Sequence, residues 1–221
     1  MNEPEEPEES PGKPVSRGAE AALTRVEWLG LAAMRKDRDP KAYRPKPLDD
    51  RLRRERTRNE ARLLREARSL GVRTPVVYDI DLPHHRLVLE ELPGPTLKAL
   101  LEAEAAGLGE LAGPVGAFGE ALGRLHAGGM SHGDLTSSNV LYPSGAEGAP
   151  AFVDLSMGAR PASLEERGID LHLVEEDLAS LHPKGHALFL RFLEGYSTGN
   201  PEGSAEVRKR AKEIKGRIRY A

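Results

Sequence analysis

The chain has 221 residues, of which 38% are hydrophobic and 30% charged, and its formal net charge is -3 at pH 7. It contains no cysteine, which excludes disulfides and thiolate metal sites. No apolar run approaches the roughly 18 residues of a membrane span, and the acidic N-terminus does not resemble a secretory signal. We therefore expect a soluble, cytoplasmic protein that buries its core in one or two domains.

The two ends of the chain carry opposite charge. Five Glu fall within residues 3–9, and this Glu- and Pro-rich start predicts a disordered acidic tail over residues 1–14. At the other end, seven Lys or Arg against one Glu lie between Val207 and Tyr220, which predicts a basic C-terminal tail over residues 208–221.

The first structured segment is predicted to be a hairpin. A turn of small residues at Gly18, Ala19 and Glu20 leads into an alternating run up to Val26, and the backbone amides of such a turn can approach phosphates. The turn lacks the full Gly-x-Gly-x-x-Gly, so a plain turn is the alternative. A strand is predicted next over residues 31–36.

Lysines near the end of that strand are candidates for contacting the phosphates of a nucleotide. The candidates are Lys36, Lys41 and Lys46, and the residues alone do not decide which of them contacts the phosphates. A helix follows from Leu48 to a C-cap at Gly71, as near-helical leucine spacing indicates.

Glu60 on this helix has two possible partners. It could pair with the strand lysine and fix its position, or it could pair with a helical neighbour such as Arg56 in an ordinary surface ion pair.

Two further strands are predicted over residues 76–79 and 86–92, and backbone groups from Glu90 to Leu92 would be placed to bind an adenine edge. The Pro-Gly-Pro at residues 93–95 predicts a lobe boundary, with Thr96 capping a helix that runs to Leu101.

The second half of the chain is predicted to hold helices around a short hairpin. The helices are expected over residues 115–126, 169–181 and 187–196. The hairpin strands are expected over residues 140–142 and 151–153, which would bring Asp134 and Asp154 together because these residues flank the hairpin.

The spacing of three polar residues around this hairpin carries the functional prediction. Asp134 is followed five residues later by Asn139, and Asp154 comes fifteen residues further on. In phosphoryl transfer one Asp orients the attacking hydroxyl or water, while an Asn and a second Asp hold magnesium against the nucleotide phosphates. Magnesium takes hard oxygen ligands and keeps several waters, so these side chains suffice if a nucleotide is bound upstream.

The run His-Gly-Asp-Leu-Thr-Ser-Ser-Asn at residues 132–139, with the later Asp, resembles the protein-kinase-like superfamily. Several other stretches together resemble one branch, the small atypical kinase subunit of the KEOPS/EKC complex, from about residue 16 to 219. These stretches are residues 17–21, 36–44, 48–49, 56–62, 169–171, 181–183 and 216–219.

This resemblance implies an α+β, minimal bilobal kinase-like fold, with a β-rich nucleotide-binding N-lobe (15–93) and a truncated helical C-lobe (94–207) that holds the catalytic loop and the metal site. It implies ATP and Mg²⁺ as cofactors. It selects Lys36 as the phosphate-binding lysine and Glu60 as its partner, with Asp134 as the catalytic base. Asn139 and Asp154 become the magnesium ligands.

The resemblance also implies partners. They are the threonylcarbamoyl-transferase subunit of the complex, a small regulatory subunit on the N-lobe, and tRNA near the basic C-terminal tail. The activity would support threonylcarbamoyladenosine formation on tRNA, and no membrane is involved.

One position departs from the family pattern. The usual Asp-Phe-Gly is here Asp154-Leu155-Ser156. We expect Leu155 to fill the apolar slot of the Phe, so that metal binding is kept while conformational switching is reduced.

The length after Asp154 bears on the reaction. Only 67 residues follow it, which leaves no room for a long activation segment or a large substrate platform. We therefore expect ATP hydrolysis or autophosphorylation rather than broad protein-kinase activity, and the acceptor stays open between water, a partner and the chain itself. The alternatives are a small-molecule phosphotransferase of the aminoglycoside or choline kinase type, and a non-catalytic scaffold that binds tRNA through basic segments.

Overall fold

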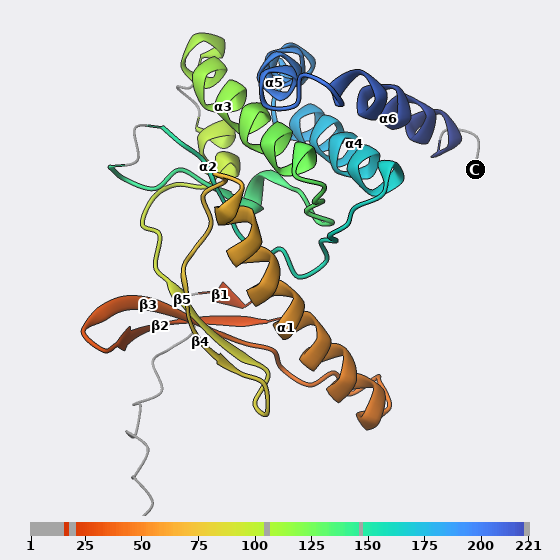
Figure 1. The fold of residues 1–221 in the computed structure, drawn as a ribbon. Helices are drawn as coiled ribbons and strands as arrows, with labels where there is room; N and C mark the ends of the chain where they lie inside the picture. Colours follow the sequence, from red (N-terminus) through yellow and green to blue (C-terminus); the bar gives the residue numbers. More distant parts are fainter. Residues whose placement is uncertain (1–15, 18–20, 104–106, 146–147, 219–221) are drawn as a thin grey trace, which may run out of the picture.

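The structure is a computed structural model that describes residues 16–17, 21–103, 107–145 and 148–218. A β-sheet and a group of helices form its two halves, and the long helix α1 (Lys46–Ser69) extends from the sheet toward the helices (Figure 1). Within the described residues, no helix combines the length and the apolar character needed to cross a membrane.

The N-terminal half is built on one antiparallel sheet with the strand order β1-β2-β3-β5-β4. Its strands are β1 (Ser16–Arg17), β2 (Ala22–Trp28), β3 (Leu31–Asp37), β4 (Val77–Asp81) and β5 (Arg86–Glu90). The central strand β3 pairs with β5 in a register that sets Lys36 opposite Leu87 and Ala33 opposite Glu90. Lys36 is therefore held in the middle of the sheet, where the backbone is fixed on both sides.

Helix α1 packs its apolar face against the rest of the protein and exposes a highly charged face. Leu63, Leu64 and Ala67 are buried, and the helix is followed by Gly71 at φ +73°, a left-handed conformation that favours glycine. These bounds agree with the helix predicted between Leu48 and Gly71.

The C-terminal half consists of helices and one short hairpin. Its helices are α2 (Leu97–Glu102), α3 (Leu108–Ala127), the 3₁₀ turn η1 (Ser137–Asn139), α4 (Leu164–Leu181), α5 (Gly185–Gly199) and α6 (Ser204–Ile218). The hairpin pairs β6 (Val140–Leu141) with β7 (Ala151–Phe152). As predicted, Thr96 caps α2 by accepting a hydrogen bond from the amide of Ala99.

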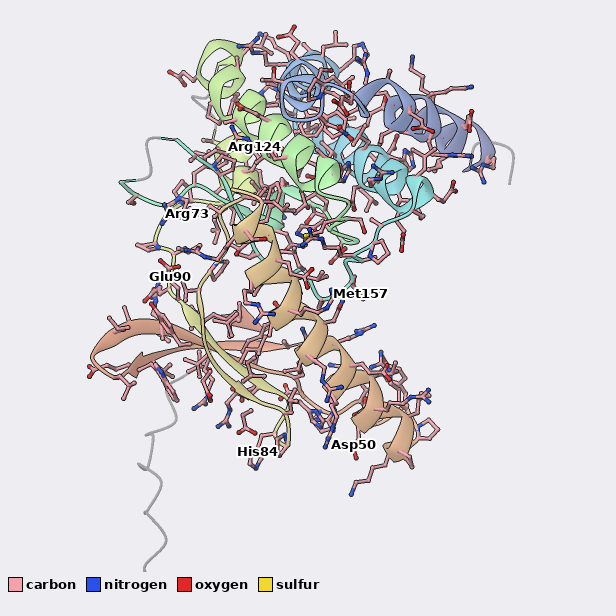
Figure 2. The ribbon with its side chains drawn as sticks, viewed as in Figure 1. Asp50, Arg73, His84, Glu90, Arg124 and Met157 are labelled. Carbon is pink, nitrogen blue, oxygen red and sulfur yellow. The ribbon has the colours of Figure 1, made fainter. Side chains whose placement is uncertain are left out.

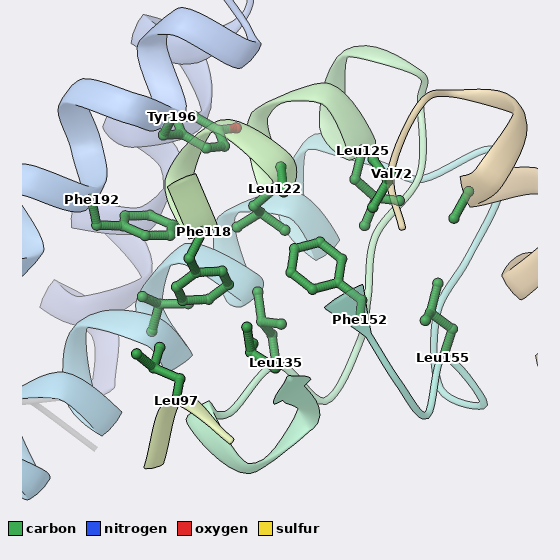
Figure 3. Close-up of a cluster of buried hydrophobic side chains, with 14 of the residues drawn as sticks. Val72, Leu97, Phe118, Leu122, Leu125, Leu135, Phe152, Leu155, Phe192 and Tyr196 are labelled. Atoms are coloured by element: carbon green, nitrogen blue, oxygen red, sulfur yellow. The ribbon is translucent and has the colours of Figure 1, made fainter. Parts of the chain in front are cut away.

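An apolar cluster joins the hairpin to the helices (Figure 3). Phe152 of β7 makes an edge-to-face contact with Phe118 of α3, with 5.9 Å between ring centroids. Phe118 in turn lies 4.9 Å from the ring of Phe192 on α5. Because Phe152 stands two residues before Asp154, this packing fixes the base of the segment that carries that carboxylate.

Helices α3 and α5 approach each other through glycine. A Cβ on Gly119 would lie 2.0 Å from the carbonyl oxygen of Phe192, and one on Gly195 would lie 2.0 Å from that of Gly116. Since these neighbours are backbone atoms, the two helices can pack this closely only without side chains there.

Two helices begin earlier than the sequence predicted. Helix α3 starts at Leu108 rather than at 115 and includes Pro114, whose carbonyl oxygen accepts a hydrogen bond from Tyr142. Helix α4 starts at Leu164 rather than at 169. Its observed start is stabilised by a reciprocal capping box between Ser163 and Glu166.

The basic C-terminal segment begins inside a helix. Val207, Ala211 and Ile214 recur on one face of α6 and are buried, and α6 packs against α4. The division of the chain into two lobes and two tails stays a prediction, and residues 1–15 and 219–221 lie outside the described residues.

Candidate active site

Lys36 and Glu60 form a buried ion pair between the sheet and α1. The Lys36 Nζ lies 2.8 Å from Glu60 Oε1, with 7% and 1% of their side chains exposed. The second oxygen of Glu60 accepts a hydrogen bond from Arg38, which is also buried. Glu60 thus pairs with the strand lysine, as one of the two expectations had it, and the burial of all three charges requires that they stay together.

Asp154 completes this group from the other half of the molecule. Its Oδ1 lies 2.9 Å from Lys36 Nζ and accepts a 2.7 Å hydrogen bond from the Ser156 hydroxyl. Burial alone would raise the pKa of Asp154, but the charge of Lys36 and these hydrogen bonds outweigh it and lower the pKa to about 2. The carboxylate is therefore ionised at neutral pH.

The segment after Asp154 is tied directly to α1. The side-chain amide of Asn59 donates hydrogen bonds to the carbonyl oxygens of Ser156 (3.2 Å) and Gly158 (3.0 Å). Between them, Met157 lies beside α1 (Figure 2). Leu155 is fully buried in the apolar cluster, as expected for a residue in place of Phe. These contacts hold Asp154 in its left-handed backbone conformation, φ +57°.

Asp134 and Asn139 lie on the loop between α3 and β6. Asp134 is exposed, and its carboxylate forms no hydrogen bond or ion pair with the described residues. Asn139 donates its amide to the backbone oxygen of Asp134 at 2.8 Å, which leaves its own side-chain oxygen available as an acceptor or ligand.

The loop depends on Gly133 for its path. Gly133 has φ +83°, and a Cβ there would lie 2.2 Å from the carbonyl oxygen of Met157. Only glycine allows the loop that carries Asp134 to approach the segment after Asp154 this closely. The glycine before Asp134 therefore brings the two carboxylate-bearing segments together.

A buried carboxylate on α4 also holds the loop between α3 and β6. Asp170 is fully buried and accepts hydrogen bonds from the backbone amides of His132 (2.7 Å) and Gly133 (2.9 Å). His126 donates to Asp170 at 3.2 Å and accepts from the Tyr196 hydroxyl at 2.8 Å. Burial lowers the pKa of His126 and of His132, so both rings are neutral and support this loop.

The remaining predicted site residues are less closely connected. Glu90 ends β5, and its carboxylate accepts a hydrogen bond from the Val76 amide at 3.0 Å, while Leu92 is buried just beyond the strand. Gly18, Ala19 and Glu20 lie outside the described residues. Among the predicted site residues, the structure brings Glu60 and Asp154 into contact with the same atom, Lys36 Nζ.

Sequence reasoning missed three residues that hold this arrangement. Arg38 stands two residues after the lysine, so the alternation of β3 would have suggested it. Asn59 and Asp170 act through backbone carbonyls and amides far away in the sequence, for which no local pattern exists.

Comparison with known proteins agrees with this architecture. The chain matches the Rio2 kinase of Chaetomium thermophilum, solved as an ADP/Mg²⁺-phosphoaspartate complex, with a TM-score of 0.57, 15% identity, and coverage of 95% of this chain and 70% of that one. No family model matches the sequence. The two-part fold and this likeness define the chain as a protein of the kinase-like fold.

Two sequence relatives narrow the class. The chain is 35% identical over 217 residues to the KEOPS complex subunit Bud32 of Pyrococcus abyssi, covering 94% of this chain and 96% of that protein. It is 40% identical over 212 residues to a probable bifunctional tRNA threonylcarbamoyladenosine biosynthesis protein of Methanosarcina acetivorans, covering 96% of this chain but 36% of the relative's length. The chain belongs to the Bud32 family of KEOPS complex subunits.

Proposed function

We propose that this protein is an ATP-dependent atypical serine/threonine kinase or ATPase that supports threonylcarbamoyladenosine formation on tRNA within a KEOPS complex. One observation carries the proposal: a single ammonium group, Lys36 Nζ, lies within 3 Å of both Glu60 on α1 and Asp154 on the opposite half. This links the two halves of the molecule at the point where kinase-like proteins bind the phosphates.

The side chains present fit magnesium and a nucleotide. Asp154 is ionised and Asn139 has a free amide oxygen, and both are hard oxygen donors. Two protein ligands suffice for magnesium, because it takes its other ligands from phosphate and water. Asp154 and Asn139 would hold the magnesium, whose positive charge would offset the negative charge of the phosphates.

The chain's own residues divide the remaining work. Lys36 would donate hydrogen bonds to the phosphates, held in place by Glu60. Asp134, exposed and unpaired among the described residues, would accept the proton of the attacking hydroxyl or orient a water. The backbone at Glu90 and Leu92 would meet the adenine edge, and the turn at residues 18–20 would approach the phosphates.

The acceptor is proposed to be water or a hydroxyl of the chain itself or of a partner. Because Asn59 and Ser156 already hold the Asp154 segment, the site needs little rearrangement before it reacts. Catalysis would then rest on positioning and charge stabilisation rather than on a switch in this segment.

The proposed partners are the threonylcarbamoyl-transferase subunit, a small regulatory subunit on the sheet-bearing half, and tRNA at the basic C-terminus. Deleting residues 215–221 should weaken tRNA or transferase binding while leaving nucleotide binding intact, because the deleted residues lie outside the proposed nucleotide site. Unchanged tRNA affinity and complex activity after this deletion would refute the role of the C-terminus.

The test of the activity is ATP turnover by the wild type, Asp134→Ala and Asp154→Ala, each alone and with the transferase subunit. Turnover should fall by about 10²- to 10⁴-fold in Asp134→Ala. Glu202→Ala, which removes an exposed carboxylate in the turn before α6, should leave turnover unchanged. Equal turnover in all variants, or tRNA binding by a wild type that turns over no ATP, would instead indicate a non-catalytic scaffold.

A further inference from the structure

The exposed face of α1 carries a row of arginines at intervals of one helical turn. Their spacings of three or four residues place them on one side of the helix, over about 21 Å of its length. The row, called here the α1 arginine face, consists of Arg51, Arg54, Arg58, Arg62 and Arg65.

Most of this positive charge is not neutralised by neighbours. Arg54, Arg58 and Arg65 are exposed and form no hydrogen bond or ion pair with any residue that the structure describes. Arg51 reaches Glu55 only at 4.0 Å, with both side chains exposed. Arg62 is the exception, since it contacts Glu66 and Asn59.

The basic helix α6 differs in this respect. Lys215 lies 2.7 Å from Glu175 on α4, and Arg217 lies 3.2 Å from Glu165 on the same helix. Arg210 also approaches Glu165, at 3.5 Å. Much of the charge of α6 is thus used in packing against α4, whereas that of the α1 arginine face is available.

A groove of about 760 Å³ runs beside this face, between α1 and β4. Arginines 58, 62, 65 and 68 line one wall, and Tyr78, Asp79 and Ile80 of β4 lie on the other. A second hollow, of about 370 Å³, lies on the other side of the same helix next to Ser156. Arg58 and Arg62 line both, so they form a ridge between the two hollows.

We propose that the α1 arginine face binds the phosphate backbone of RNA and that unpaired bases enter the groove against Tyr78. Guanidinium groups bind phosphates in a two-pronged geometry, and aromatic rings stack on exposed bases. This surface would be a second RNA-binding surface besides the one proposed at the C-terminus. Only the identification of the RNA as a tRNA rests on the proposed function.

The groove favours RNA over an acidic peptide. Asp79 on its wall would repel carboxylates lying in the groove, but it can accept hydrogen bonds from the amino groups of bases. An acidic peptide is therefore kept as an outcome of the test.

The test compares three proteins for binding of a fluorescently labelled tRNA transcript across a range of salt concentrations. The first is the wild-type chain, and the second is Arg54→Gln/Arg58→Gln/Arg65→Gln. Gln has a helix propensity close to that of Arg, so α1 should remain intact. The third, Lys98→Gln/Arg124→Gln/Arg191→Gln, removes the same charge from exposed ion pairs on other helices (Figure 2 labels Arg124).

The α1 variant should bind the transcript at least tenfold more weakly, and its slope of log affinity against log salt should fall by about 2, from roughly 0.7 for each lost phosphate contact. The control variant, Lys98→Gln/Arg124→Gln/Arg191→Gln, should change neither the affinity for the transcript nor its salt slope by more than twofold. All three proteins should bind ADP equally, because the substitutions lie outside the proposed nucleotide site.

An equal loss of RNA binding in the control and the α1 variant would show that only net charge matters, and would overturn the proposal. Unchanged RNA binding in the α1 variant would also overturn it. Binding of a polyglutamate peptide as tight as that of the transcript, and lost in the α1 variant, would identify the face as an acidic-peptide site. ATP turnover by the wild type separates these outcomes from a failure of the proposed activity.

Discussion

Lys36 and Glu60 on the sheet side of the site are buried and paired, whereas Asp134 on the loop side is exposed and its carboxylate has no partner among the described residues. On the sheet side the charges satisfy one another, so breaking the group leaves a buried charge alone. On the loop side the carboxylate stays solvated and available. The sheet side should therefore contribute mainly to stability, and the loop side mainly to reactivity.

The largest expected effect is on the loop side. Asp134→Asn should lower ATP turnover by about 10²- to 10⁴-fold because it removes the proposed proton acceptor, while the melting temperature should change little. Turnover and a thermal melt on the same preparation measure both. A large fall in melting temperature would mean that Asp134 supports the fold, contrary to the comparison.

On the sheet side, Glu60→Gln should destabilise the protein by about 3–5 kcal/mol because it leaves Arg38 buried without a counter-charge and leaves Lys36 with Asp154 alone. Chemical denaturation measures this free energy of unfolding. Glu55→Gln is the matched control on the same helix, since its 4.0 Å exposed ion pair contributes about 0–1 kcal/mol. Equal effects of the two substitutions would contradict the assignment of stability to the buried group.

Asn59→Asp tests how the two sides are connected. The substitution keeps the oxygen that accepts from Arg62 but removes both hydrogen bonds to the Asp154 segment, so it should cost about 1–3 kcal/mol of stability and weaken ADP binding. The control is Arg62→Gln, which removes the contacts of Arg62 with Asn59 and Glu66 but keeps both hydrogen bonds from Asn59 to the Asp154 segment. Unchanged ADP affinity in Asn59→Asp would show that Asp154 does not depend on α1.

The smallest effect concerns pH. The pKa of Asp154 is lowered from 3.8 to about 2, so the stabilisation that its ionised form provides is fully present above pH 3.8 and lost as pH falls toward 2. A carboxyl NMR titration should find the Asp154 midpoint near 2 in the wild type. In Lys36→Met, if it folds, the midpoint should move upward, and an unmoved midpoint would rule out Lys36 as the cause.

The sequence was sufficient wherever the information was local. The hairpin that separates Asp134 from Asp154 follows from two apolar runs and a glycine-rich turn, and α1 follows from its leucine spacing. The start of α4 was missed although its capping box, Ser163 and Glu166, is present in the sequence. A closer reading of capping residues would have found it.

The site was less predictable because its contacts join distant parts of the chain. Three lysines were candidates for one role until the family resemblance selected Lys36, and Arg38 was not predicted as a second partner of Glu60. The clamp from Asn59 to the carbonyl oxygens of Ser156 and Gly158 spans 97 and 99 residues. Such contacts arise only when α1 packs beside this segment.

The central claim is that Lys36, Glu60, Asp134, Asn139 and Asp154 surround one magnesium-bound nucleotide. The most direct measurement is the affinity for ADP with and without magnesium, in the wild type and in Asp154→Asn. Magnesium should tighten ADP binding at least tenfold in the wild type and have little effect in the variant. An equal response to magnesium in both proteins, or none in the wild type, would contradict the claim.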